Sequence, residues 1–186
     1  MKTSDKVYKM TIAALLCAIG IIIPMYSPIK ILLEPASFTL ASHVATMIAM
    51  FISPATAVAV AIGTTLGFFI GGFPIVVVLR AGTHLVWALI GSSIIKNRRS
   101  IMDGTASRFG LSMLIAIIHA ISEMLVVMPF YFGNGMSQAY YAKGFIVSIV
   151  LLVGVGTLVH SLVDFAIASF IWKPLAKTTR VSQLQG

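Results

Sequence analysis

Charged residues are scarce in this 186-residue chain, of which 10% is charged and 59% is hydrophobic. A soluble globular domain carries about a quarter charged residues. So few charges cannot cover a water-facing surface, which argues against a soluble enzyme domain. A helical membrane span needs roughly 20 residues, so the length fits six spans and leaves no room for an ATPase domain. We predict an all-α, polytopic membrane protein with one domain, residues 1–186, folded as a six-transmembrane-helix bundle.

Acidic residues and cysteine are also rare. The chain has 5 Asp and Glu residues against 13 Lys and Arg, and its single cysteine, Cys17, lies within an apolar run. One cysteine excludes an intramolecular disulfide and offers no metal-ligand spacing. The basic residues lie mostly in short segments between apolar runs, which is typical of residues that orient membrane spans. We therefore expect the lipid bilayer, and no nucleic acid, as a partner.

Prolines, glycines and basic segments divide the chain into six apolar stretches. We predict helices over residues 7–25, 37–53, 55–72, 74–96, 106–129 and 144–172. The second and third are separated only by Ser53 and Pro54. A broken, re-entrant or tilted arrangement is therefore an open alternative for that pair.

The basic residues are distributed unequally between the two ends of these helices. With the N-terminus inside, only Lys30 and Lys143 fall on the outer side. The inner set is Lys2, Lys6, Lys9, Lys96, Arg98, Arg99, Arg108, Lys173, Lys177 and Arg180. Because cytoplasmic loops carry an excess of Lys and Arg, we predict that both termini are cytoplasmic.

The two longer outer loops do not look like ordinary solvated segments. Residues 24–36 are apolar but interrupted by prolines, which suggests a stiff lid over a binding site; a loop lying on the membrane interface is the alternative. The loop over residues 130–143 contains Asn134 together with Tyr131 and other aromatic residues. That mixture suits a small-molecule site, although tyrosine is also common at membrane interfaces.

Ionisable residues within the predicted spans are the strongest functional signal, because buried charges are costly in a bilayer and usually face a cavity. Arg80 and His84 are four residues apart, and so are His119 and Glu123; this spacing places each pair on one helix face. Counted from the prolines that bound their helices, Arg80 and Glu123 both lie about 9 Å below the outer edge. We predict a cluster of these four side chains beneath the outer loops.

These residues also admit structural interpretations. Arg80 and Glu123 could simply neutralise each other between two helices. His160 and Asp164 share one helix face, where a helix–helix hydrogen bond would account for them equally well, and His43 fits an interhelical contact better than a ligand. Neither a His-Glu-x-x-His motif nor a nucleophile motif is present. We therefore predict no metal site, no cofactor and no catalytic residue.

Small residues form two further patterns in the predicted helices. Ala14 and Ala18 are four residues apart in the first helix, a spacing that makes a flat groove for another helix. That helix could belong to a partner membrane protein or to this chain. Gly63 and Gly67 repeat the spacing in the third helix. Their pattern predicts close helix packing rather than phosphate binding.

Two stretches and the overall design resemble a known family. They are Lys-Val-Tyr-Lys-Met-Thr-Ile-Ala-Ala-Leu-Leu-Cys-Ala-Ile-Gly at 6–20, followed by the proline-broken loop, and Pro-Ala-Ser-Phe-Thr-Leu-Ala-Ser-His-Val at 35–44. Over nearly its whole length the chain resembles the substrate-binding S-component of energy-coupling factor (ECF) vitamin transporters. The resemblance implies a vitamin-binding protein of the bacterial plasma membrane that is not itself an enzyme. It would work with a transmembrane coupling subunit and two ATPase subunits, and the pair Ala14 and Ala18 looks like the docking motif for the coupling subunit.

The resemblance also implies where the vitamin binds. Carried onto this chain, the site falls on Arg80, His84, His119, Glu123, Tyr131 and Asn134, with Tyr26 in the lid. The guanidinium of Arg80 suits a carboxylate, so we expect an anionic vitamin: pantothenate first, then niacin or hydroxymethylpyrimidine. The alternative function is a proton-coupled secondary transporter or channel that uses the intramembrane His, Glu and Asp residues as a relay. An intramembrane enzyme with a His/Glu metal site is a third possibility.

Overall fold

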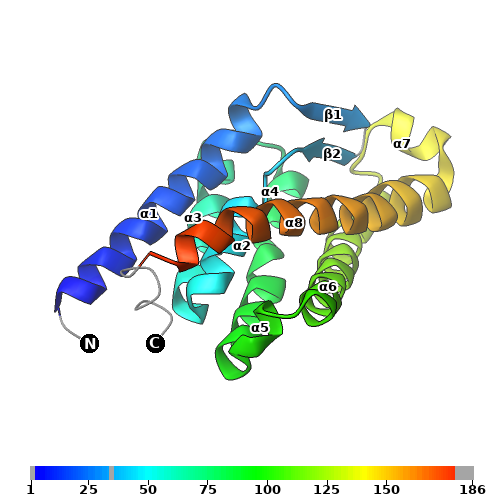
Figure 1. Ribbon diagram of the computed structural model, residues 1–186. Helices are drawn as coiled ribbons and strands as arrows, with labels where there is room; N and C mark the ends of the chain where they lie inside the picture. The colour runs from blue at the N-terminus through cyan, green and yellow to red at the C-terminus, as the bar shows by residue number, and fades with distance from the viewer. Residues whose placement is uncertain (1–2, 34–35, 179–186) are drawn as a thin grey trace.

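The computed structural model describes residues 3–33 and 36–178. Helices account for most of this part of the chain (Figure 1). They are α1 (Thr3–Tyr26), α2 (Val44–Ile52), α3 (Pro54–Ile70), α4 (Ile75–Gly82), α5 (His84–Asn97), the 3₁₀-helix η1 (Arg99–Met102), α6 (Thr105–Phe132), α7 (Gln138–Ala142), the π-helix η2 (Ile146–Val155) and α8 (Gly156–Ala176). Two antiparallel strands, β1 (Lys30–Leu33) and β2 (Ala36–Thr39), connect α1 to α2.

Within the described residues, four helical stretches are long and apolar enough to cross a membrane. They are Asp5–Tyr26, Ile75–Asn97, Thr105–Phe132 and Ile146–Ala176, and α3 is a shorter apolar helix. This agrees with a helical membrane bundle, although four candidate spans are fewer than the six that we predicted. The difference lies in α2 and α3, the pair for which a broken arrangement was an open alternative.

The short helix α2 forms the centre of the bundle. Nine residues of helix span about 14 Å, too little to cross a bilayer. All nine of its residues are buried, as expected of a helix that is apolar on every side. The apolar character of this segment therefore reflects burial within the protein rather than contact with lipid.

The all-α class is confirmed, and the β-hairpin corrects only the predicted start of the second helix. We expected the second helix to begin at residue 37, but residues 36–39 form β2, which pairs with β1 from Lys30 opposite Thr39 to Leu33 opposite Ala36. A non-helical segment close to a bilayer must satisfy its backbone hydrogen bonds internally. Pairing of the two strands does this, and β2 also contacts α8.

The fourth and sixth predicted helices are both interrupted near their polar residues. Thr83 separates α4 from α5, and its hydroxyl donates a hydrogen bond to the Arg80 carbonyl at 2.7 Å. The π-helix η2 precedes α8, which begins at Gly156. Wide or broken helical turns are frequent at functional sites. Here they lie directly beside the side chains described below.

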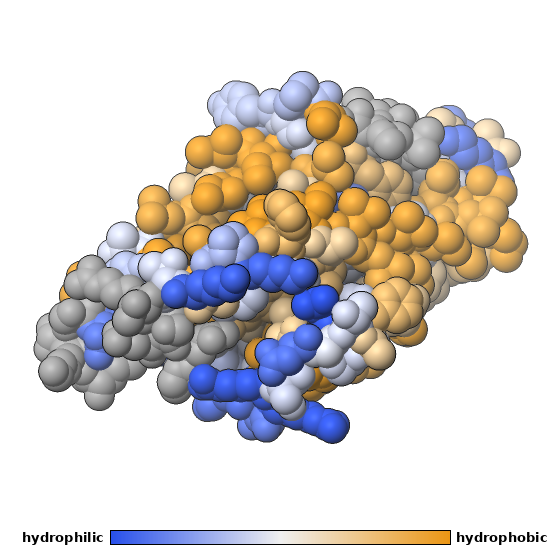
Figure 2. Space-filling view, in the orientation of Figure 1, coloured by the Kyte–Doolittle hydropathy of each residue, from blue (hydrophilic) through white to orange (hydrophobic). Residues whose placement is uncertain are grey.

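The basic end of the bundle is separate from its apolar band. The first turn of α1 and the last turn of α8 lie at the same end (Figure 1). Hydrophilic side chains gather at this end, and a hydrophobic band covers the middle of the visible face (Figure 2). The described ends of the chain therefore lie on one side of the band, as a membrane protein with both termini on one face requires.

Close packing of α1 against α3 depends on small residues. A Cβ at Gly63 would lie 2.5 Å from Cys17 Sγ, and one at Gly20 would lie 2.5 Å from Thr64 Cγ2. A Cβ at Gly67 would overlap the side chain of Ile21. The predicted role of Gly63 and Gly67 in helix packing is therefore confirmed.

Ala14 and Ala18 face away from this contact. Both alanines are exposed on α1, and neither is needed for the close approach of α1 to α3. Larger apolar side chains on the same helix, among them Leu15 and Ile19, are exposed as well. The structure therefore leaves the alanine groove open to lipid or to another protein.

Candidate functional site

A small cavity of about 70 Å³ lies inside the bundle under the β-hairpin. Residues of α1, β2, the turn before α2, α3, α4, α5, α6 and α8 line it. Its polar lining consists of Thr39, Ser42, His43, Thr46, Thr64, Arg80, His84, Glu123, Thr157 and His160. Because this polar lining lies within an otherwise apolar bundle, the cavity is the best candidate for a binding site.

Glu123 on α6 ties three helices together at the cavity wall. Its Oε2 accepts a hydrogen bond from Arg80 Nη2 at 2.8 Å and another from the Thr157 hydroxyl at 2.6 Å. Its Oε1 lies 3.4 Å from His119 Nε2. The ion pair that we considered as a structural alternative is thus present. It occupies one amino group of Arg80 and leaves the rest of the guanidinium for another partner.

Asp164 on α8 holds the start of α2. Its Oδ1 accepts from the backbone N–H of Ala41 at 2.8 Å, and its Oδ2 accepts from the backbone N–H of His43 at 2.9 Å. The same Oδ2 lies 3.0 Å from His43 Nδ1 and 3.4 Å from His160 Nε2. Asp164 therefore orders the turn that presents His43, which agrees with the structural interpretation of this residue.

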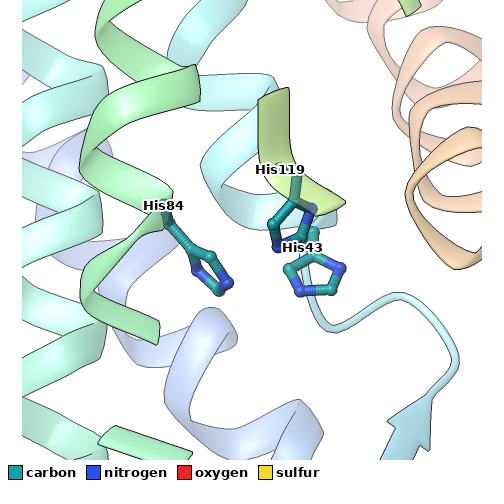
Figure 3. A group of neighbouring side chains, drawn as sticks. All are labelled: His43, His84 and His119. Carbon is teal, nitrogen blue, oxygen red and sulfur yellow. The ribbon is translucent and has the colours of Figure 1, made fainter. Parts of the chain in front are cut away.

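Histidine rings from separate elements meet at the floor of the cavity. The ring of His43 lies 4.7 Å, centroid to centroid, from those of both His84 and His119, and the His84 and His119 rings are 5.1 Å apart. The three rings approach one another in Figure 3. Trp87, which is fully buried, packs against His84 and His119 at 5.5 and 5.3 Å. His160 lies 4.8 Å from His43 on the side toward the hairpin.

Several buried polar atoms at this site have no hydrogen-bond partner among the described residues. They are Arg80 Nε, Trp87 Nε1 and His119 Nδ1, while His119 Nε2 has only the 3.4 Å contact with Glu123. An unsatisfied buried polar group costs about 1–3 kcal/mol, so protein interiors seldom contain several together. Arg80 lines the cavity, and the other two surround it at the histidine rings. The arrangement favours a ligand that supplies acceptor atoms.

The structure brings four of the predicted site residues together. Arg80, His84 and Glu123 line the cavity, and His119 lies directly behind them in contact with the His43 and His84 rings. The matched depths that we derived for Arg80 and Glu123 are consistent with their 2.8 Å contact.

The other three predicted site residues lie away from the cavity. Tyr26 is 74% exposed at the end of α1, and Asn134 is exposed with a φ of 55°. Tyr131 packs in a separate aromatic cluster, where its carbonyl accepts from the Tyr141 hydroxyl at 3.1 Å. The loop after α6 thus folds on its own aromatic side chains instead of covering the cavity.

Phe38 of β2 takes the covering position that we had assigned to Tyr26. Its ring lies 5.5 Å from the His160 ring and stands over Gly156, where a Cβ would lie 2.5 Å from Phe38 Cζ. Sequence reasoning missed it because residue 38 fell within the predicted second helix. It also missed Thr157 and the central place of His43.

A second hollow lies at the basic end of the bundle. It is an open groove of about 610 Å³ between α1, the α2–α3 turn and α5, and Lys6, Lys9, Lys96 and Arg99 are among its lining residues. Most of its surface is apolar, and it does not include the histidine cluster. The smaller internal cavity has the more specific chemistry.

Comparisons with known proteins complete the description. Over 173 residues the chain is 40% identical to the niacin transporter NiaX of Lactococcus lactis subsp. cremoris (strain MG1363); the alignment covers 92% of this chain and 76% of that protein. No family model and no solved structure matches the chain. Because the identity extends over most of both proteins and agrees with the transmembrane design, the chain belongs to the S-component family of ECF vitamin transporters.

Proposed function

We propose that this protein binds nicotinate, the anionic form of niacin, in the internal cavity and delivers it to an ECF-type importer. The observation that carries the proposal is the group of unpaired buried polar atoms at a small cavity with polar residues in its lining: Arg80 Nε, Trp87 Nε1 and His119 Nδ1. A carboxylate can accept hydrogen bonds from an arginine fork in a fixed geometry. The similarity to a niacin transporter supports the same ligand.

The size of the cavity favours nicotinate over pantothenate. A volume of 70 Å³ holds about five water-sized spheres. Nicotinate, a single ring with one carboxylate, would therefore need much less additional space than pantothenate. Pantothenate is a longer, flexible chain with hydroxyl and amide groups, and it would require the helices around the cavity to separate. We therefore place niacin ahead of pantothenate, the ligand that the sequence had favoured.

The lining suggests how the ligand is oriented. The carboxylate would lie against the free edge of the Arg80 guanidinium, whose Nη2 is held by Glu123. The flat ring would lie among the aromatic faces of Phe38, His84 and His160, which border the same cavity. Thr39 also lines the cavity, and its hydroxyl would supply a donor for the ring nitrogen.

The exposed alanines of α1 support a role in a larger transport complex. Ala14 and Ala18 lie on a face that packing within the chain does not use. We propose that this face docks a transmembrane coupling subunit and that two partner ATPases supply the energy, since this chain is a binding subunit and not an enzyme. We also propose the bacterial plasma membrane as its location, with both termini in the cytoplasm.

The proton-relay alternative gains no support from the carboxylates. Glu123 is engaged by Arg80 and Thr157. Asp164 is engaged by two backbone N–H groups and by His43. A relay group must release and take up protons during transport, whereas these hydrogen bonds hold both carboxylates in one state. The arrangement fits a fixed binding site better.

Ligand binding to the purified protein tests the proposal. A Trp172→Phe background leaves Trp87 as the reporter beside the histidine rings. We expect nicotinate to change its fluorescence with one site per chain and without ATP, and nicotinamide to bind at least about tenfold more weakly because it lacks the charge. Tighter binding of pantothenate, or equal binding of nicotinate and nicotinamide, would overturn the assignment.

A further inference from the structure

Three histidines with no local sequence motif converge beside the vitamin cavity. His43 comes from the turn before α2, His84 begins α5 and His119 lies within α6. All three are buried, and each offers a ring nitrogen within 4.8 Å of the others. No pair is stacked face to face, since the rings meet at interplanar angles of 81°, 83° and 90°. The ring edges, which carry the nitrogens, can therefore face a common point (Figure 3).

The spacing is close to that of a zinc site. Zn–N bonds of about 2.0–2.1 Å in tetrahedral geometry place the ligand nitrogens about 3.4 Å apart. A separation of at most 4.8 Å exceeds this value by about 1.4 Å. The three rings are already neighbours, so we expect them to close this gap when an ion binds.

Carboxylates already support two of the three rings. His43 Nδ1 lies 3.0 Å from Asp164 Oδ2, and His119 Nε2 lies 3.4 Å from Glu123 Oε1. Metal-binding histidines usually place their second nitrogen against such a carboxylate, which fixes the ring and strengthens it as a ligand. The opposite nitrogens, His43 Nε2 and His119 Nδ1, are then the metal-binding atoms. His119 Nδ1 is fully buried and has no hydrogen-bond partner.

A neighbouring group, His43 with His160 and Asp164, is the weaker candidate. Its atoms are also close together. However, Asp164 already accepts two backbone hydrogen bonds, and His160 Nε2 lies 3.0 Å from the Ser42 hydroxyl. These atoms have partners without a metal, whereas His119 Nδ1 has none among the described residues.

We propose that His43, His84 and His119 bind one divalent transition-metal ion of the Zn²⁺ class. His43 and His84 line the cavity and His119 does not, so the fourth position of a three-histidine site would open toward the cavity. A donor atom of the vitamin could occupy this open coordination position. That role rests on the proposed function, whereas binding of the metal ion itself does not depend on it.

Metal binding is measured first without any vitamin. Protein from which the affinity tag has been cleaved is stripped with chelator and then equilibrated with Zn²⁺ or Co²⁺. We expect about one ion per chain by elemental analysis, and a Co²⁺ visible absorption typical of tetrahedral coordination that Zn²⁺ removes. Stripped wild-type protein that takes up no ion overturns the proposal, and this arm does not depend on the folding of any variant.

Variants then locate the ion. His84→Gln and His119→Gln should each weaken Zn²⁺ binding at least about a hundredfold, while His160→Gln, the matched control, should retain it. Size-exclusion profiles identify the variants that fold. Loss of Zn²⁺ binding in His160→Gln, with binding retained in His84→Gln and His119→Gln, would assign the ion to the neighbouring group and refute the site described here.

Nicotinate titration with and without Zn²⁺ tests the open position. We expect at least about tenfold tighter binding of nicotinate to the metal-loaded protein. Equal affinity in both forms would refute coordination of the vitamin while leaving the proposed vitamin binding intact. Absence of nicotinate binding in both forms, together with a bound ion, would instead refute the proposed function and leave the metal site standing.

Discussion

Replacing Arg80 separates its two roles, counter-ion of Glu123 and ligand of the vitamin. In Arg80→Met the Glu123 carboxylate, 3% exposed, retains the Thr157 hydroxyl and the nearby His119 but loses its 2.8 Å ion pair. Removing one partner of a buried pair costs about 3–5 kcal/mol. We expect the midpoint of thermal unfolding to fall sharply in this variant. Arg80→Met with Glu123→Gln removes both charges and should recover most of the loss.

Nicotinate affinity should not recover in the double variant. A hydrogen bond to a charged group contributes about 1.5–3 kcal/mol, which corresponds to roughly 10–100-fold in affinity. Isothermal titration of nicotinate should show this loss in both variants, and binding of nicotinamide should change less. If the double variant regains wild-type affinity for nicotinate, Arg80 serves only to neutralise Glu123, and the reasoning for the anionic ligand is refuted.

Three further changes test other parts of the structure. Replacing Ala14 and Ala18 by Trp should preserve nicotinate affinity but abolish uptake and co-purification with partner subunits; intact uptake would show that the exposed face is not a docking surface. Gly156→Ala should displace the Phe38 ring, which a Cβ would approach to 2.5 Å, and speed nicotinate release roughly tenfold in stopped-flow measurements; an unchanged rate would exclude this ring as a cover. Asp164→Asn should cost about 2–3 kcal/mol by weakening its backbone contacts at Ala41 and His43, and an unchanged unfolding midpoint would contradict that anchoring role.

The cluster of Arg80 and Glu123 could be predicted because local rules applied to both residues. Each was predicted to lie on a long apolar helix bounded by a proline, so depth followed from the rise per residue, although α6 continues past Pro129 to Phe132. The i,i+4 spacing then identified His84 and His119 as neighbours of the pair. These inferences require only the helix geometry of two segments, and the observed 2.8 Å contact agrees with them.

The role of His43 could not be predicted because its partners lie far away in the sequence. Its ring contacts come from α5, α6 and α8, and spacing within its own segment gives no sign of them. The start of α2 was missed for a related reason. Residues 37–43 are as compatible with an apolar helix as with a strand and a turn, and tertiary contacts with Asp164 and Gly156 decide between them.

The attachment of the hairpin affects how cargo leaves the protein. On the α2 side, Asp164 accepts hydrogen bonds from the backbone N–H groups of Ala41 and His43. Phe38, in contrast, contacts α8 through its ring. Ala41, with a φ of 68°, lies between the hairpin and this anchored turn, so we expect any movement of the hairpin to leave His43 in place. Movement of the hairpin would then set the residence time of the vitamin. A compound that holds Phe38 against α8 would keep the vitamin in the cavity.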